Sequence, residues 1–217
     1  MKFYDQLKQE TDQARLHLYA APMIQGALQG TIKKEEYIAF LTQAYHHVRH
    51  TVPLLMACGS RLGSEYEFMK KAIAEYIEEE YGHEQWILND VLACGGDAEQ
   101  VKSIAPDLTT DLMVRYAYHQ IDRGNPVGFF GMVFVLEGTS TALATQAAEM
   151  IKKSLQLPNQ AFSYLLSHGS LDQDHVKFFE QLVNQLTKKE DQLCIIRTAK
   201  DIFKLYGDIF RKIPELV

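Results

Sequence analysis

Apolar residues recur at spacings of three and four along almost the whole chain, and this pattern constrains the fold more than any other feature. That period gathers apolar side chains on one face of an α-helix, whereas a half-buried strand needs strict alternation. Neither Asn-Gly nor Asp-Gly stands between alternating runs, so the common hairpin signal is missing. We therefore expect an all-α fold, a multi-helix bundle.

Glycine and proline residues divide this pattern into about seven or eight helices. Pro53 should kink the second long segment beyond His50, because proline removes a backbone donor. The stretch 95–106 is the most loop-like, with at most a short helix at 97–103. The predicted helices are 3–20, 33–62, 65–93, 109–123, 126–154, 158–186 with a bend near Gly169, and 188–213.

Length and composition favour a single domain, residues 1–217. The 47% hydrophobic content can build one sizeable core, and no repeat or flexible linker divides the chain.

With 22 basic and 28 acidic residues and no basic run, nucleic acid is an unexpected partner. The polar N-terminal segment and the short apolar runs predict a cytoplasmic protein without a membrane anchor. Cys58, Cys94 and Cys194 form no CxxC pair, so we interpret them as small core residues.

Within 65–93, a carboxylate and an imidazole interrupt an otherwise apolar helical stripe. The stripe comprises Met69, Ile73, Tyr76, Glu80, His83, Ile87 and Val91. Glu75 and Glu78 project the other way, so most of the acidic run EYIEEE is a solvated face and only Glu80, or Glu79, turns inward.

Two further segments direct polar groups inward. Glu137 follows PVGFFGMVFVL, which is apolar on every side, and a carboxylate buried there needs a cation because an unpaired one is costly. His168, Asp172 and His175 stand four and then three residues apart, on one face of their helix.

Together these segments supply six donors: Glu80, His83, Glu137, His168, Asp172 and His175. Three carboxylates and three histidines match a pair of iron or manganese ions held inside a helical bundle. A lone Glu-x-x-His arises often by chance, and buried histidines are often simply hydrogen-bonded in the core. Three separate unpaired burials are nevertheless harder to explain than one metal site.

The chain also resembles a known group, the haem-oxygenase-like di-iron oxidases and oxygenases. Residues 27–55, ALQGTIKKEEYIAFLTQAYHHVRHTVPLL, look like the segment shared by haem oxygenases, thiaminase II and pyrroloquinoline-quinone synthase. The six donors match the metal set of the di-iron group. The resemblance implies a haem-oxygenase-like fold, two Fe2+ ions with manganese as an alternative, O2 and a small organic substrate as partners, and a possible homodimer.

One position departs from the group, because some members place the first carboxylate seven residues before the histidine, where this chain has Tyr76. Glu80 or Glu79 must then be the ligand. We name Tyr76 and His50 as candidate catalytic residues. His47 and His50 lie at the edge of an apolar stripe and are candidates to face a cavity, whereas His46 should be exposed.

Rival activities within the fold leave signatures in the sequence. Thiaminase II enzymes carry a nucleophilic cysteine in the helix corresponding to VFVLEGTST, which contains none. Haem oxygenases carry a ligating histidine where this chain has Arg15, with His17 out of register. A cofactor-independent enzyme of the same fold and a metal-free regulatory or interaction protein remain the alternatives, and metal content would distinguish them.

Overall fold

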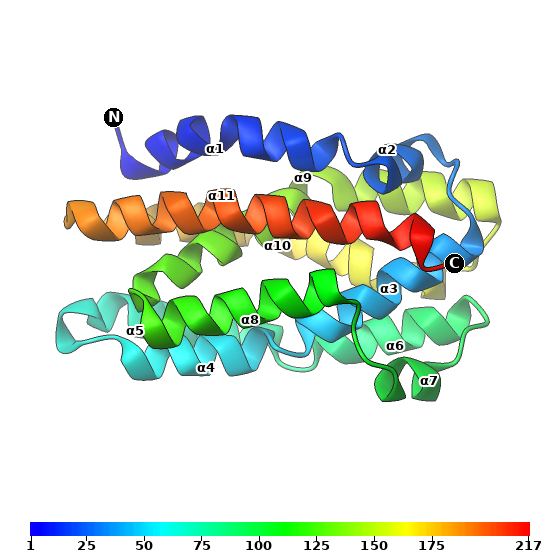
Figure 1. Cartoon of the computed structure of the whole chain (residues 1–217), viewed down its shortest axis with the longest axis horizontal. Helices are drawn as coiled ribbons and strands as arrows, with labels where there is room; N and C mark the ends of the chain where they lie inside the picture. Colours follow the sequence, from blue (N-terminus) through cyan, green and yellow to red (C-terminus); the bar gives the residue numbers. More distant parts are fainter.

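The computed structural model describes residues 1–167 and 175–217, and within them every regular element is helical. The helices lie roughly along one long axis, with the two termini toward opposite ends (Figure 1). The α-helices are α1 Phe3–Tyr19, α2 Pro22–Gln29, α3 Lys34–Val48, α4 Thr51–Arg61, α5 Glu67–Glu80, α6 His83–Ala93, α7 Ala98–Ser103, α8 Leu108–Arg123, α9 Phe130–Leu155, α10 Ser163–Val183 and α11 Lys189–Lys212. Short 3-10 helices are η1 Ser64–Tyr66, η2 Pro126–Phe129, η3 Asn159–Phe162 and η4 Ile213–Glu215. The all-α prediction is confirmed.

Two of the long predicted segments are each broken into two helices. The segment 33–62 ends its first helix at Val48 and restarts at Thr51, which places Pro53 in the first turn of α4, where its missing donor costs nothing. The segment 65–93 breaks at Tyr81 and Gly82, and Gly82 has a left-handed φ of 89°. The prediction of one continuous helix over 65–93 is therefore wrong, because glycine permits the left-handed conformation that interrupts the helix there.

The helix α2 was not predicted. Pro22 stands at its start and Gly30, with φ of 67°, ends it in the left-handed region. A Cβ at Gly30 would lie 3.2 Å from the carbonyl oxygen of Met150, so α2 approaches α9 closely at this point. Both signals were present in the sequence, but the eight-residue helix is too short to show a clear apolar period.

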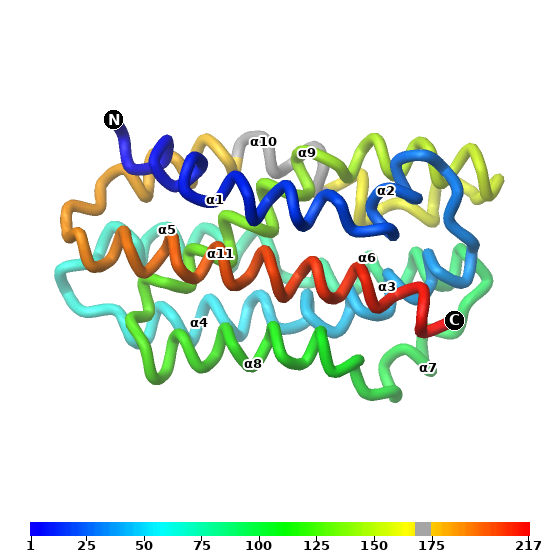
Figure 2. The backbone as a smooth tube through the Cα atoms, turned by 45° about the horizontal axis from the view of Figure 1, so that its top comes forward, coloured from blue at the N-terminus to red at the C-terminus, as the bar shows by residue number. Residues whose placement is uncertain are grey.

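The apolar helix α9 packs against α2, α10 and α11. The backbone trace shows α9 running beside α10 at the top of the view (Figure 2). By length and composition alone, Pro126–Leu155 is the one stretch among the described residues that could cross a bilayer, yet 67% of its most apolar window is buried inside the fold. It therefore fits a core helix of this bundle.

The start of α10 is held by a carboxylate on another helix. Asp90 of α6 is fully buried and accepts hydrogen bonds from the backbone N–H groups of Ser163 at 3.0 Å and Tyr164 at 2.9 Å, and from the Ser163 hydroxyl. Burial raises the pKa of Asp90, and these hydrogen bonds oppose that rise. The cap fixes where α10 begins, and α10 carries part of the predicted metal set.

Candidate metal centre and cavity

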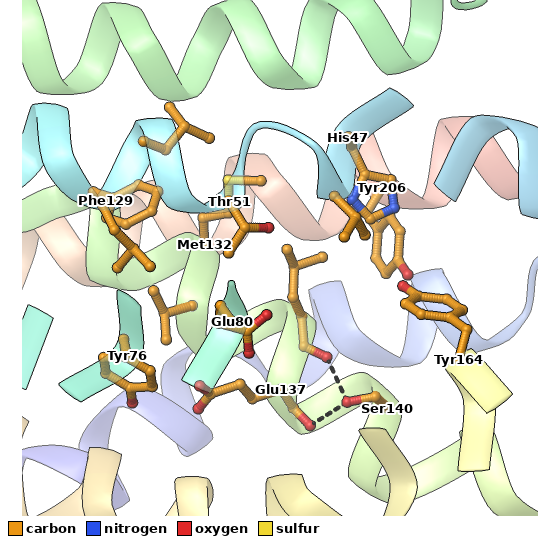
Figure 3. A pocket seen from close by; sticks show the side chains of 15 residues that line it. His47, Thr51, Tyr76, Glu80, Phe129, Met132, Glu137, Ser140, Tyr164 and Tyr206 are labelled. Atoms are coloured by element: carbon orange, nitrogen blue, oxygen red, sulfur yellow. Dashed lines mark hydrogen bonds between the residues drawn. The ribbon is translucent and has the colours of Figure 1, made fainter. Parts of the chain in front are cut away.

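Glu80 and Glu137 lie on the wall of a cavity of about 90 Å³, which we call the carboxylate cavity (Figure 3). Among the described residues that line it there is no lysine or arginine. The lining side chains are His47, Val48, Thr51, Leu54, Leu55, Tyr76, Glu80, Phe129, Met132, Val133, Leu136, Glu137, Ser140, Tyr164 and Tyr206. Two acidic groups therefore share a mostly apolar cavity, where negative charge is costly unless positive charge or hydrogen bonds offset it.

Glu80 ends α5 and His83 begins α6, so the break at Gly82 separates them. Glu80 Oε2 lies 3.0 Å from Nδ1 of His83, and the two side chains are only 12% and 5% exposed. The indole of Trp86 stacks on the His83 ring, with centroids 3.9 Å apart and planes 25° from parallel. The stacking restricts the orientation of the imidazole.

His175 joins the carboxylates of α5 and α9. Its Nε2 lies 2.8 Å from Glu79 Oε2, and its Nδ1 lies 3.8 Å from Glu137 Oε1. Glu137 is nearly buried, whereas the Glu79 side chain is 54% exposed and reaches in from the protein surface. Glu79 and Glu80 thus contact different histidines, and both remain available as the first carboxylate ligand.

Tyr76 occupies one end of the carboxylate cavity and is almost fully buried. Burial raises the pKa of its phenol, and the negative charges of Glu137, Glu79 and Glu80 raise it further. The Tyr76 ring also meets the His175 ring edge-on, with centroids 5.9 Å apart. At neutral pH this phenol keeps its proton beside the carboxylates.

The other predicted residues have different outcomes. His168 and Asp172 lie outside the described residues. His47 lines the carboxylate cavity, as expected, whereas His50 does not, and His50 Nδ1 instead lies 3.2 Å from the Tyr118 hydroxyl. The prediction that His46 is exposed is wrong, because α3 packs between α6 and α8 and its far face is also covered.

Several lining residues were missed by sequence reasoning. Tyr164 and Tyr206 come from α10 and α11, and their hydroxyl groups point toward one another at the end of the cavity opposite Tyr76 (Figure 3). Thr51 lines another wall and begins α4. No local pattern marks these positions, because only the packing of distant helices brings them together.

The chemistry of the donors fits iron, which accepts imidazole nitrogen and carboxylate oxygen. Among the described side chains, no three His, Cys, Asp or Glu residues already form a metal-binding group. The donors instead stand as the Glu80–His83 pair and as His175 between Glu79 and Glu137. Of these five residues, Glu80 and Glu137 line the carboxylate cavity, while His83 contacts Glu80 and His175 contacts Glu137 and Glu79.

The fold is that of the haem oxygenases and their structural relatives. A haem-oxygenase-like domain of unknown function from Shewanella denitrificans superposes with a TM-score of 0.89 at 20% identity, covering 100% of this chain and 93% of that one. A TenA homologue from Pseudomonas syringae pv. tomato gives 0.84 at 8% identity, covering 98% and 93%. Haem oxygenase-2 from Synechocystis, solved with haem and NO, gives 0.78 at 14% identity, covering 100% and 86%.

A family assignment follows from the sequence itself. The sequence profile described as "iron-containing redox enzyme" matches residues 38–207, which is most of the chain. The chain belongs to this family of iron-containing redox enzymes with a haem-oxygenase-like fold. Among curated proteins, none matches the sequence.

Proposed function

We propose that this chain is a non-haem di-iron oxidase or oxygenase that uses O2 to oxidise a small organic substrate. One observation carries the proposal: Glu80 and Glu137 face a mostly apolar cavity that no lysine or arginine among the described residues lines, with His83 and His175 in contact with acidic groups at its edge. A buried acidic cavity of this kind is stabilised by bound cations. Family membership makes iron the favoured cation.

The ligands we assign are His83, Glu137 and His175, with Glu80 or Glu79 as the first carboxylate and with His168 and Asp172 completing the set. When bound, the iron ions would supply electrons and open coordination positions for O2. The imidazoles of His83 and His175 bind metal only when neutral, so occupancy should fall in acid.

The surrounding residues have separate roles in this proposal. The apolar wall formed by Met132, Val133 and Leu136 excludes water from the reacting groups. The phenol of Tyr76 keeps its proton and can donate a hydrogen bond to a negatively charged group near Glu137. His47 and Thr51 offer hydrogen bonds to the polar part of a substrate on the opposite side.

Iron content tests the proposal directly. Protein loaded with Fe2+ under nitrogen and then desalted should hold about two iron ions per chain, as bundle sites of this donor type do. The variants Glu137→Gln and His175→Ala should lose at least one of them. Glu78→Gln, an exposed change on α5, is the matched control and should load normally. Wild-type protein that retains no iron would refute the proposal and favour a cofactor-independent enzyme of the same fold.

A further inference from the structure

A second cavity of about 80 Å³ adjoins the carboxylate cavity, and we call it the apolar chamber. It lies between α2, α3, α9, α10 and α11, on the side away from Glu80 and Glu137. Ser140, Tyr164 and Tyr206 line both spaces, so the two cavities meet at these residues. The tyrosine rings stand at this junction (Figure 3).

The walls of the apolar chamber carry no charged side chain among the described residues. Tyr37 contributes only its ring, because its hydroxyl donates to the carbonyl oxygen of Ala161 at 2.8 Å. The Ser140 hydroxyl donates within its own helix, to the carbonyl oxygens of Leu136 and Glu137. The buried hydroxyl of Thr139 has no hydrogen-bond partner among the described residues, so this wall offers one polar contact.

Such a space is unfavourable unless something fills it. Each cavity is several times larger than the roughly 15 Å³ that one water molecule needs, and an apolar cavity left empty destabilises a fold. The chamber is also partly built by α2, whose Met23, Ile24 and Ala27 line it. The fold therefore maintains an apolar space directly beside the candidate centre.

We propose that the apolar chamber binds the hydrocarbon tail of the substrate while its oxidisable, polar end lies in the carboxylate cavity. This inference rests on the proposed function and adds the substrate class, an amphipathic molecule with an apolar tail. The polar end contacts His47 or Thr51, and the tail enters the chamber at the junction lined by Ser140, Tyr164 and Tyr206. Side chains that reduce the chamber then limit the length of tail that binds.

Binding of 1-alkanols, from butanol to decanol, to the full-length protein under nitrogen tests this inference. The absence of O2 prevents turnover, so calorimetry reports binding alone. Each added methylene buried should tighten binding about fourfold. A wild-type affinity that does not depend on chain length would overturn the inference.

Substitutions on α9 then locate the tail. Ala147 is half-buried and lines the chamber, so Ala147→Phe should stop the gain in affinity at a shorter alkanol. Ala144→Leu is a second, smaller enlargement in the same wall and should have the same effect. Ala142→Phe is the control, because Ala142 is exposed and lines neither cavity. If Ala147→Phe and Ala144→Leu, shown folded by circular dichroism, bind decanol as tightly as Ala142→Phe does, the tail does not lie there.

Continuity of the two cavities has its own test. Val133→Phe narrows only the carboxylate cavity and should also weaken decanol binding if one ligand spans both spaces. Unchanged decanol affinity in Val133→Phe would show that the chamber is a separate site. Iron content measured on the same samples tests the di-iron site separately from the chamber. Ala147→Phe should bind as much iron as the wild type. Wild-type protein without iron would refute the di-iron assignment, whereas alkanol binding would still decide the chamber.

Discussion

Replacing Asp90 by alanine should destabilise the protein strongly, although Asp90 is not a proposed ligand. The change removes the acceptor of two backbone N–H groups at the start of α10, one fully buried at Tyr164 and one partly buried at Ser163. A buried donor left without a partner costs about 1–3 kcal/mol, and we therefore expect a loss of about 3 kcal/mol. In a chain of this size that loss lowers the Tm by roughly 6–12 °C.

Urea unfolding followed by far-ultraviolet circular dichroism measures this loss. Asp90→Asn keeps one carbonyl acceptor and should lose about half as much. Asp97→Ala is the matched control, since Asp97 caps only the short exposed α7 through the N–H groups of the next turn and should cost about 1 kcal/mol. If Asp90→Ala loses no more than Asp97→Ala, the cap does not hold α10 and the energetic reasoning is wrong.

Three further predictions concern single side chains. Glu80→Gln should lose about one iron ion per chain, and Glu79→Gln, at a more exposed position, should lose less iron. Elemental analysis measures both losses, and a larger loss in Glu79→Gln would make Glu79 the ligand. Burial lowers the pKa of His46 below its usual 6.5, so the unfolded state takes up the proton first and the stability should fall as the pH drops through 6.5. The free energy of unfolding in urea should therefore depend less on pH in His46→Gln than in the exposed control His119→Gln. Equal pH dependence in the two variants would contradict this. Burial raises the pKa of Cys58 to about 12, so this thiol should resist an alkylating reagent at neutral pH until urea is added, as mass spectrometry of the labelled peptide would show.

The helical stripe on 65–93 shows what a periodic pattern can predict. Its apolar members Met69, Ile73, Ile87 and Val91 are all buried, together with Tyr76 and His83, even though the helix breaks between them. The periodic pattern still predicts the buried face, because the short break leaves the inner faces of α5 and α6 both directed toward the core. Gly82 was the only sequence signal for the break, and a lone glycine does not distinguish a tolerated helical residue from a helix break.

The error at His46 and the missed tyrosines have a different origin. A single stripe assumes one covered face, but residues 41–48 of α3 are all buried because neighbouring helices cover the helix from more than one side. Tyr164 and Tyr206 are far apart in the sequence, and each would pass for an ordinary core aromatic. Shared cavity walls depend on how helices cross, which local periodicity does not encode.

The break at Gly82 separates the two halves of the proposed first metal segment, so Glu80 and His83 need not share one helical register. Nothing lies within 4 Å of a Cβ built at Gly82, so the position demands only its backbone angle and leaves room around it. Along an unbroken helix, moving a ligand by one residue would rotate it about 100° away from its partner. Here α6 keeps His83 and Trp86 in place while the end of α5 presents both Glu79 and Glu80 to histidines. Because Glu79 and Glu80 each contact a histidine from the end of α5, a first carboxylate ligand in this segment does not depend on the position of Tyr76.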